Sequence, residues 1–113
     1  MCDGRQPQIY GTGDQERDFV FVEDVVQANI LAIEEGDRTI YNIGTGKGTS
    51  VNDLFLELRQ ITSYKWDAEH MPARPGEVYK ISLSSDKAFS ELGWSPKISL
   101  AEGLEQTIEF FRE

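Results

Sequence analysis

The chain has 113 residues, of which 20 are acidic and 11 basic, so its net charge at pH 7 is −9. This length predicts a single domain over residues 1–113, and the acidic balance argues against a nucleic-acid or membrane partner because such surfaces need clustered Lys and Arg. The single cysteine, Cys2, excludes an internal disulfide, and the single histidine, His70, leaves no cluster of metal ligands, so we expect a cytoplasmic protein without a metal. No apolar run approaches the roughly 20 residues that span a bilayer, and we expect no leader.

The first elements predicted along the chain are two short strands and a helix. A strand is expected at Gln8–Tyr10, and a strand buried on both faces at Phe19–Val22, where four apolar residues follow one another without alternation. Asp24 is expected to cap a helix through Glu35, which Gly36 ends. Apolar residues occupy most of the circumference of this helix, so it should pack between two surfaces. A chain this short offers few such surfaces, which indicates a piece of something larger.

The middle of the chain predicts a strand at Thr39–Ile43, a glycine loop and a helix that Ser50 caps. That helix carries one apolar stripe, formed by Val51, Leu54, Phe55, Leu58 and Ile61. A further short strand is expected at Ala68–Met71, and apolar and polar residues alternate only weakly over Val78–Leu83.

Two helices are predicted near the carboxyl end. Ser84 or Ser85 should cap a short helix that Gly93 closes, with an inner face made of Ala88, Phe89 and Leu92. A capping box at Ser99–Glu102 should start the last helix, whose inner face holds Leu100, Leu104, Ile108 and Phe111. The pattern predicts an α/β fold with short strands and about four helices.

Two loops each carry one arginine, Arg17 within Gly11–Asp24 and Arg74 within Ala73–Glu77. Guanidinium groups offer bidentate donors that match phosphate oxygens, so two of them on an acidic chain point to a site for a doubly charged anion. The alternative is two surface arginines paired with acidic neighbours, and composition alone favours it.

Other motifs do not complete a catalytic set. The Gly44–Thr49 loop follows a predicted strand and opens a helix, but it lacks the third glycine and the later acidic residue of a dinucleotide site, so a plain strand-to-helix turn explains it better. The Gly11–Gly13 loop precedes a strand and offers no helix dipole to a phosphate. His70 has no nucleophile that the sequence places beside it, and Cys2 has no basic cluster to activate its thiol.

Six blocks run in order over nearly the whole chain: Pro7–Gly11, Gln15–Ala28, Tyr41–Gly46 with Ser50 and Val51, Arg74–Glu77, Asp86–Ala88, and Leu92–Pro96 with Leu100–Leu104. Together they resemble the carboxyl-terminal part of the NAD-dependent sugar-nucleotide epimerases and dehydratases, which are extended short-chain dehydrogenases. The nearest pattern is that of UDP-glucose 4-epimerases. Decarboxylases and 4,6-dehydratases that act on nucleotide sugars share most of these blocks.

The resemblance implies that residues 1–113 are the small substrate-binding subdomain of an enzyme whose NAD-binding Rossmann domain is absent from this sequence. The strand of Gln8, Ile9 and Tyr10 would lie along the uracil and read it through backbone groups. Arg17 and Arg74 would hold the diphosphate of a UDP-sugar. Glu77, where the family often has Asp, would accept a hydrogen bond from a ribose hydroxyl.

The resemblance does not supply the family's catalytic pair, a Tyr-x-x-x-Lys motif. The four tyrosines are followed four residues later by Asp14, Thr45, Ala68 and Leu83. We therefore expect no catalytic, cofactor-binding or metal-binding residue in this chain and no turnover by it alone, with NAD held by the absent amino-terminal domain.

Three hypotheses follow from these observations. The first is the substrate-binding part of a UDP-sugar 4-epimerase, which interconverts UDP-glucose and UDP-galactose through a 4-keto intermediate, or of a related dehydratase or decarboxylase. The second is a stand-alone, non-catalytic nucleotide-sugar-binding module. The third is self-association of the chain through the helix from Asp24 to Glu35 and the strand before it, because exposed apolar surfaces of this kind associate.

Overall fold

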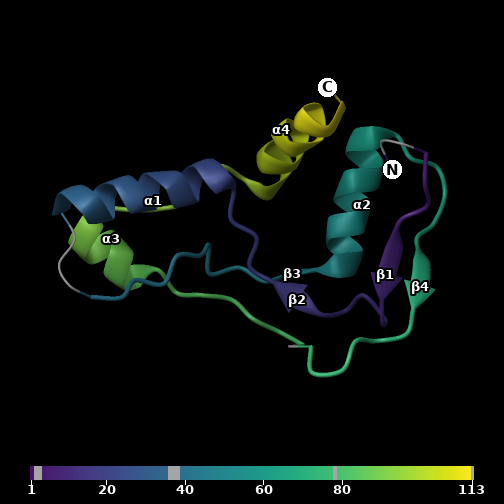
Figure 1. Cartoon of the computed structure of the whole chain (residues 1–113), viewed down its shortest axis with the longest axis horizontal. Helices are drawn as coiled ribbons and strands as arrows, with labels where there is room; N and C mark the ends of the chain where they lie inside the picture. The colour runs from purple at the N-terminus through teal and green to yellow at the C-terminus, as the bar shows by residue number, and fades with distance from the viewer. Residues whose placement is uncertain (2–3, 36–38, 78, 113) are drawn as a thin grey trace.

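The computed structural model of the chain describes residue 1 and residues 4–35, 39–77 and 79–112, and its four helices and four short strands lie within these ranges. Cys2, Gly36 and Val78, which are named above, lie outside them. The molecule measures 47 × 35 × 17 Å, and its radius of gyration is 16.3 Å (Figure 1). A compact domain of this length has a radius of gyration of about 13 Å. The chain is therefore a thin slab in which many elements have one covered face.

The strands form two separate pairs. β1 (Gln8–Tyr10) runs parallel to β4 (Glu69–Met71), and β2 (Glu16–Arg17) runs antiparallel to β3 (Thr49–Ser50). The first pair confirms the strand expected at Gln8–Tyr10 and, with a start one residue later, the one expected at Ala68–Met71. The weakly alternating segment Val78–Leu83 contains, in its described part, a single isolated bridge, from Lys80 to Glu16.

Two expected strands are wrong. Phe19, Val20 and Phe21 are irregular, Val22 already begins a helix, and Thr39–Ile43 has no strand geometry. Both stretches have the apolar, β-branched character of buried strands. A strand needs a hydrogen-bonded neighbour, and the described residues place none beside either stretch. Local propensity alone does not form a sheet here.

α1 (Val22–Glu35) begins two residues earlier than expected, so Asp24 lies in its first turn and does not cap it. The Asp24 carboxylate instead accepts hydrogen bonds from the amides of Lys97 and Ile98, each at 3.1 Å, and its carbonyl accepts one from Trp94 Nε1 at 2.8 Å. This buried aspartate therefore fastens α1 to the segment after α3 (Asp86–Leu92).

One face of α1 packs against α3, and the two helices lie together at the left end of the slab (Figure 1). The core there consists of Ala28, Ala88, Leu92 and Trp94. The opposite face carries Val22, Val26, Ile30 and Ile33, all of them exposed, and Ile33 is 85% exposed. The structure thus covers one of the two faces that the sequence pattern predicts to be buried. Phe89 of α3, expected to point inward, is 64% exposed, because within the described residues no element covers its side of the helix.

The two remaining helices confirm their predicted caps. Ser50 Oγ accepts from the amide of Asp53 at the start of α2 (Val51–Thr62), and Ser99 Oγ accepts from the amide of Glu102 at the start of α4 (Leu100–Arg112). The helices contact each other, and Ile108 of α4 is buried. Phe111, expected on the inner face of α4, is 70% exposed. Among the helices described, none is long and apolar enough to cross a membrane.

Candidate functional site

A groove of about 440 Å³ opens where β1 and β4 end. Its lining includes Tyr10 of β1 and Gln15 of the first arginine loop. It also includes Met71 of β4, Arg74 and Glu77 of the second arginine loop, and Tyr79, which follows that loop. Both strands of this parallel pair point their carboxyl ends at the groove. The loops after such strand ends are where α/β proteins commonly bind ligands. Parallel pairing thus brings together two loops that lie about 60 residues apart in the sequence.

Arg74 lies over an aromatic ring in this groove. Its guanidinium carbon is 4.0 Å from the centroid of the Tyr10 ring. A guanidinium stacked in this way is held by its face, while its N–H donors point outward along its edges. Tyr10 therefore orients Arg74 in a position from which it can bind an anion.

Arg17, at the end of β2, reaches the same groove through Glu77. Its Nη1 donates to the carbonyl of Glu16 at 2.8 Å, and its Nη2 donates to Glu77 Oε1 at 3.2 Å. Both side chains of the ion pair are about 30% exposed. The structure therefore places Glu77 in contact with Arg17 and beside Arg74 in the groove lining. The alternative of a surface arginine paired with an acidic residue holds in part for Arg17. It has an acidic partner, Glu77, although this partner is not its neighbour in sequence.

The outer edge of β1 offers backbone groups. The carbonyl of Pro7 and the amide of Gly11 bond to β4, at 2.9 Å and 2.7 Å. Backbone groups alternate along a parallel strand, so those of Gln8 and Tyr10 face the other edge. The carbonyl of Tyr10 accepts from Gln15 Nε2 at 2.9 Å. Ile9 offers nothing to this edge, because its backbone groups face β4 and its side chain is buried.

The glycine loop between β1 and β2 is held in place by Asn52 of α2. Asn52 Nδ2 donates to the carbonyl of Thr12 at 3.0 Å and to Asp14 Oδ1 at 3.2 Å, and the Asn52 amide donates to the carbonyl of Gly13. His70 Nδ1 lies 2.8 Å from the carbonyl of Gly11. No local motif predicts the roles of Gln15 and Asn52, because their partners depend on the folded path of the chain.

Asp18 organises the second glycine loop. Its carboxylate accepts from the amides of Thr45, Gly46 and Leu83 and from the Thr45 hydroxyl, at 2.6 to 3.1 Å. Burial raises the pKa of Asp18, but the hydrogen bonds from Thr45, Leu83 and Gly46 outweigh it and hold the pKa below its ordinary value of 3.8. Since these amides bind Asp18, the loop does not present them to a pyrophosphate, and its residues do not fit a dinucleotide.

Close packing around Gly44 of this loop leaves no room for a side chain at that position. A methyl group at this position would lie 2.8 Å from Asp18 Oδ2 and 2.8 Å from Leu83 Cβ. We expect Gly44→Ala to lower the free energy of unfolding by about 1 to 3 kcal/mol, measured by urea denaturation with tryptophan fluorescence.

The matched control for this substitution is Gly48→Ala. Its methyl group would meet the carboxylate end of the Glu16 side chain, which can move, so its free energy of unfolding should stay within about 1 kcal/mol of wild type. Equal losses in the two variants would contradict the close contact of Gly44 with Asp18.

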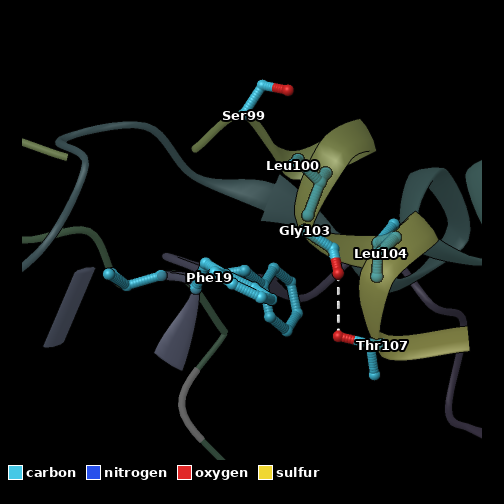
Figure 2. Close-up of a pocket in the computed structure, with 8 residues that line it drawn as sticks. Phe19, Ser99, Leu100, Gly103, Leu104 and Thr107 are labelled. Atoms are coloured by element: carbon cyan, nitrogen blue, oxygen red, sulfur yellow. Dashed lines mark hydrogen bonds between the residues drawn. The ribbon is translucent and has the colours of Figure 1, made fainter. Parts of the chain in front are cut away.

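A second cavity of about 190 Å³ lies between Phe19–Phe21 and α4. Figure 2 shows Phe19 and the labelled residues of α4 around it, with Thr107 Oγ1 donating to the carbonyl of Gly103 at 2.8 Å. Its lining holds no charged side chain. It therefore suits an apolar group, whereas the groove beside Arg74 suits an anion.

Comparison with known proteins gives consistent matches over nearly the whole chain. The family model described as GDP-mannose 4,6 dehydratase matches residues 1–107. A UDP-glucose 4-epimerase of Mycolicibacterium smegmatis is 38% identical over 110 residues, which are 96% of this chain and 35% of that protein. The structure of a UDP-glucose 4-epimerase from Thermotoga maritima with UDP-glucose has a TM-score of 0.97 at 50% identity, and the match covers 99% of this chain and 36% of that one.

A further solved structure bears on the cofactor. MoeE5 in complex with UDP-glucuronic acid and NAD has a TM-score of 0.90 at 37% identity, and the match covers 97% of this chain and 38% of that one. The chain thus spans little more than a third of the length of these relatives. It belongs to the GDP-mannose 4,6 dehydratase family of NAD-dependent sugar-nucleotide epimerases and dehydratases, and it corresponds to the carboxyl-terminal part of these extended short-chain dehydrogenases.

Proposed function

We propose that residues 1–113 are the nucleotide-sugar-binding part of a cytoplasmic UDP-sugar 4-epimerase, which interconverts UDP-glucose and UDP-galactose through a 4-keto intermediate. The observation that carries the proposal is the groove at the ends of β1 and β4, where Arg74 lines the wall and Arg17 contacts Glu77. A pyrophosphate spreads its charge over two adjacent phosphoryl groups, and two guanidinium groups beside one groove can bind both. The match to a Thermotoga maritima epimerase solved with UDP-glucose supports this substrate class.

The outer edge of β1 is the proposed contact for the base. The backbone groups of Gln8 and the amide of Tyr10 face away from β4, so they can pair with the polar edge of a uracil ring lying along β1. Glu77 donates no hydrogen bond when ionised and accepts through two oxygens. One oxygen contacts Arg17, and the other can accept a hydrogen bond from a ribose hydroxyl.

Calorimetry with UDP-glucose tests the binding half of this proposal. We expect one molecule to bind per chain, and binding of UDP tighter than binding of dTDP. The description of the matching family as GDP-mannose 4,6 dehydratase supports a second candidate, a fragment of a nucleotide-sugar dehydratase. Preference for dTDP or GDP over UDP would favour that candidate, and no binding of any of the three would contradict both.

A coupled assay tests whether the chain needs another domain for chemistry. None of its four tyrosines has a lysine four residues later, and the amides of the Gly44–Gly46 loop bind Asp18. We therefore expect no conversion of UDP-galactose to UDP-glucose by this chain with added NAD. In the proposed enzyme, a domain outside this sequence binds NAD, which accepts the hydride and returns it. The exposed face of α1 is the surface against which that domain packs. Sustained turnover by residues 1–113 would contradict this division of roles.

A further inference from the structure

Glu77 is the one acidic side chain among the described residues that line the groove, and Arg74 is the one basic side chain. The Glu77 carboxylate is 3.2 Å from the Arg17 guanidinium, and its side chain is 31% exposed. Charges at a partly covered site interact more strongly than charges in bulk water, because less solvent separates them. Glu77 therefore acts on any anion that enters this groove.

The charge balance around the groove is small. Two guanidinium groups and one carboxylate leave a net charge of one positive unit, in a chain whose net charge is −9. A nucleoside diphosphate esterified to a sugar carries two negative charges. The free nucleoside diphosphate carries about three at pH 8, because its terminal phosphate ionises a second time with a pKa of about 6. The carboxylate of Glu77 repels the additional charge of the free nucleotide.

We propose that Glu77 is a specificity-determining residue that favours a sugar-esterified diphosphate over a free nucleoside diphosphate, an inference that rests on the proposed function. A binding site gains specificity from an unfavourable contact with the wrong ligand as well as from favourable contacts with the right one. Glu77 supplies the unfavourable contact without blocking the groove, because its ion pair with Arg17 keeps the carboxylate at the wall of the groove. The same carboxylate leaves one oxygen for a ribose hydroxyl, which both ligands share, so the ribose contact does not discriminate between them.

Calorimetry at pH 8 with UDP and with UDP-glucose, on wild type and Glu77→Gln, measures this effect. We expect the ratio of Kd for UDP to Kd for UDP-glucose to fall by about 3- to 10-fold in Glu77→Gln, the size of one partly screened charge interaction. Loss of the Arg17 contact changes the affinity for both ligands together, so the ratio isolates the charge of Glu77. Glu77→Asp keeps the charge with a shorter side chain and should keep the wild-type ratio.

Glu91→Gln is the matched control. Glu91 is exposed on α3, at the opposite end of the long axis from β1 and β4 (Figure 1), and its substitution changes the net charge by the same unit. It should leave the ratio unchanged. An unchanged ratio in Glu77→Gln, with both nucleotides bound, would overturn the role of Glu77 alone. Failure of both nucleotides to bind the wild-type chain would overturn the proposed function and this inference with it.

Discussion

Replacing Arg17 or Arg74 by alanine is expected to weaken binding of UDP by about 1.5 to 3 kcal/mol, which is about a 10- to 150-fold increase in Kd. Each guanidinium would lose charge-assisted hydrogen bonds to a phosphoryl group, and these bonds are stronger than neutral ones. Lysine should restore less than half of the lost free energy at either position, because it lacks the planar fork. Calorimetry on the purified variants measures each effect.

The two arginines should differ in how they depend on their neighbours. Arg74 lies on the Tyr10 ring, so Tyr10→Leu should weaken binding while Tyr10→Phe, which keeps a ring, should cost less. Arg17 is held by the carbonyl of Glu16 and by Glu77, so it does not depend on that ring. Arg112→Ala, in the last turn of α4, removes the same charge at a distance and should leave Kd within about twofold. Wild-type affinity in both Arg17→Ala and Arg74→Ala would exclude the two residues from the site.

The helix caps that the sequence predicts correctly are determined by short-range interactions. The caps at Ser50 and Ser99 depend on residues three positions away, and the structure contains both. The strands expected at Phe19–Val22 and Thr39–Ile43 depend on a neighbouring strand, and the described residues provide none. For the same reason Phe89 and Phe111 are exposed: the periodicity shows which face of a helix is apolar, but it does not supply the surface that covers it.

The candidate site likewise contains residues that can be identified from the sequence and residues that cannot. Resemblance identifies Arg17, Arg74 and Glu77 as a set, and the parallel pairing of β1 with β4 accounts for their nearness in the structure. Asp18 and Asn52 were not predicted as supporting residues. Their partners lie 27 and 40 residues away and are mostly backbone groups, which carry no mark in the sequence. Interactions of this type become visible when the path of the chain is known.

Asp18→Asn is expected to lower the free energy of unfolding by about 2 to 3 kcal/mol at pH 7, because an amide replaces a carboxylate that several donors share. An asparagine keeps one acceptor oxygen and turns an NH₂ group toward the amides of the glycine loop or of Leu83. Asp53→Asn, an exposed residue in the first turn of α2, is the matched control and should cost less than about 1 kcal/mol.

The pH dependence of this difference provides a second test. The folded-state pKa of Asp18 is lowered, so its stabilising contribution is fully present above the ordinary, unfolded-state pKa of 3.8 and is lost as the pH falls through the folded-state pKa. The gap in unfolding free energy between wild type and Asp18→Asn should therefore be constant from pH 7 to about pH 5 and shrink below that. Urea denaturation from pH 7 to pH 3 measures the gap. A gap that stays constant over this whole range would show that the charge of Asp18 does not hold the Arg17 loop to the Gly44–Gly46 loop.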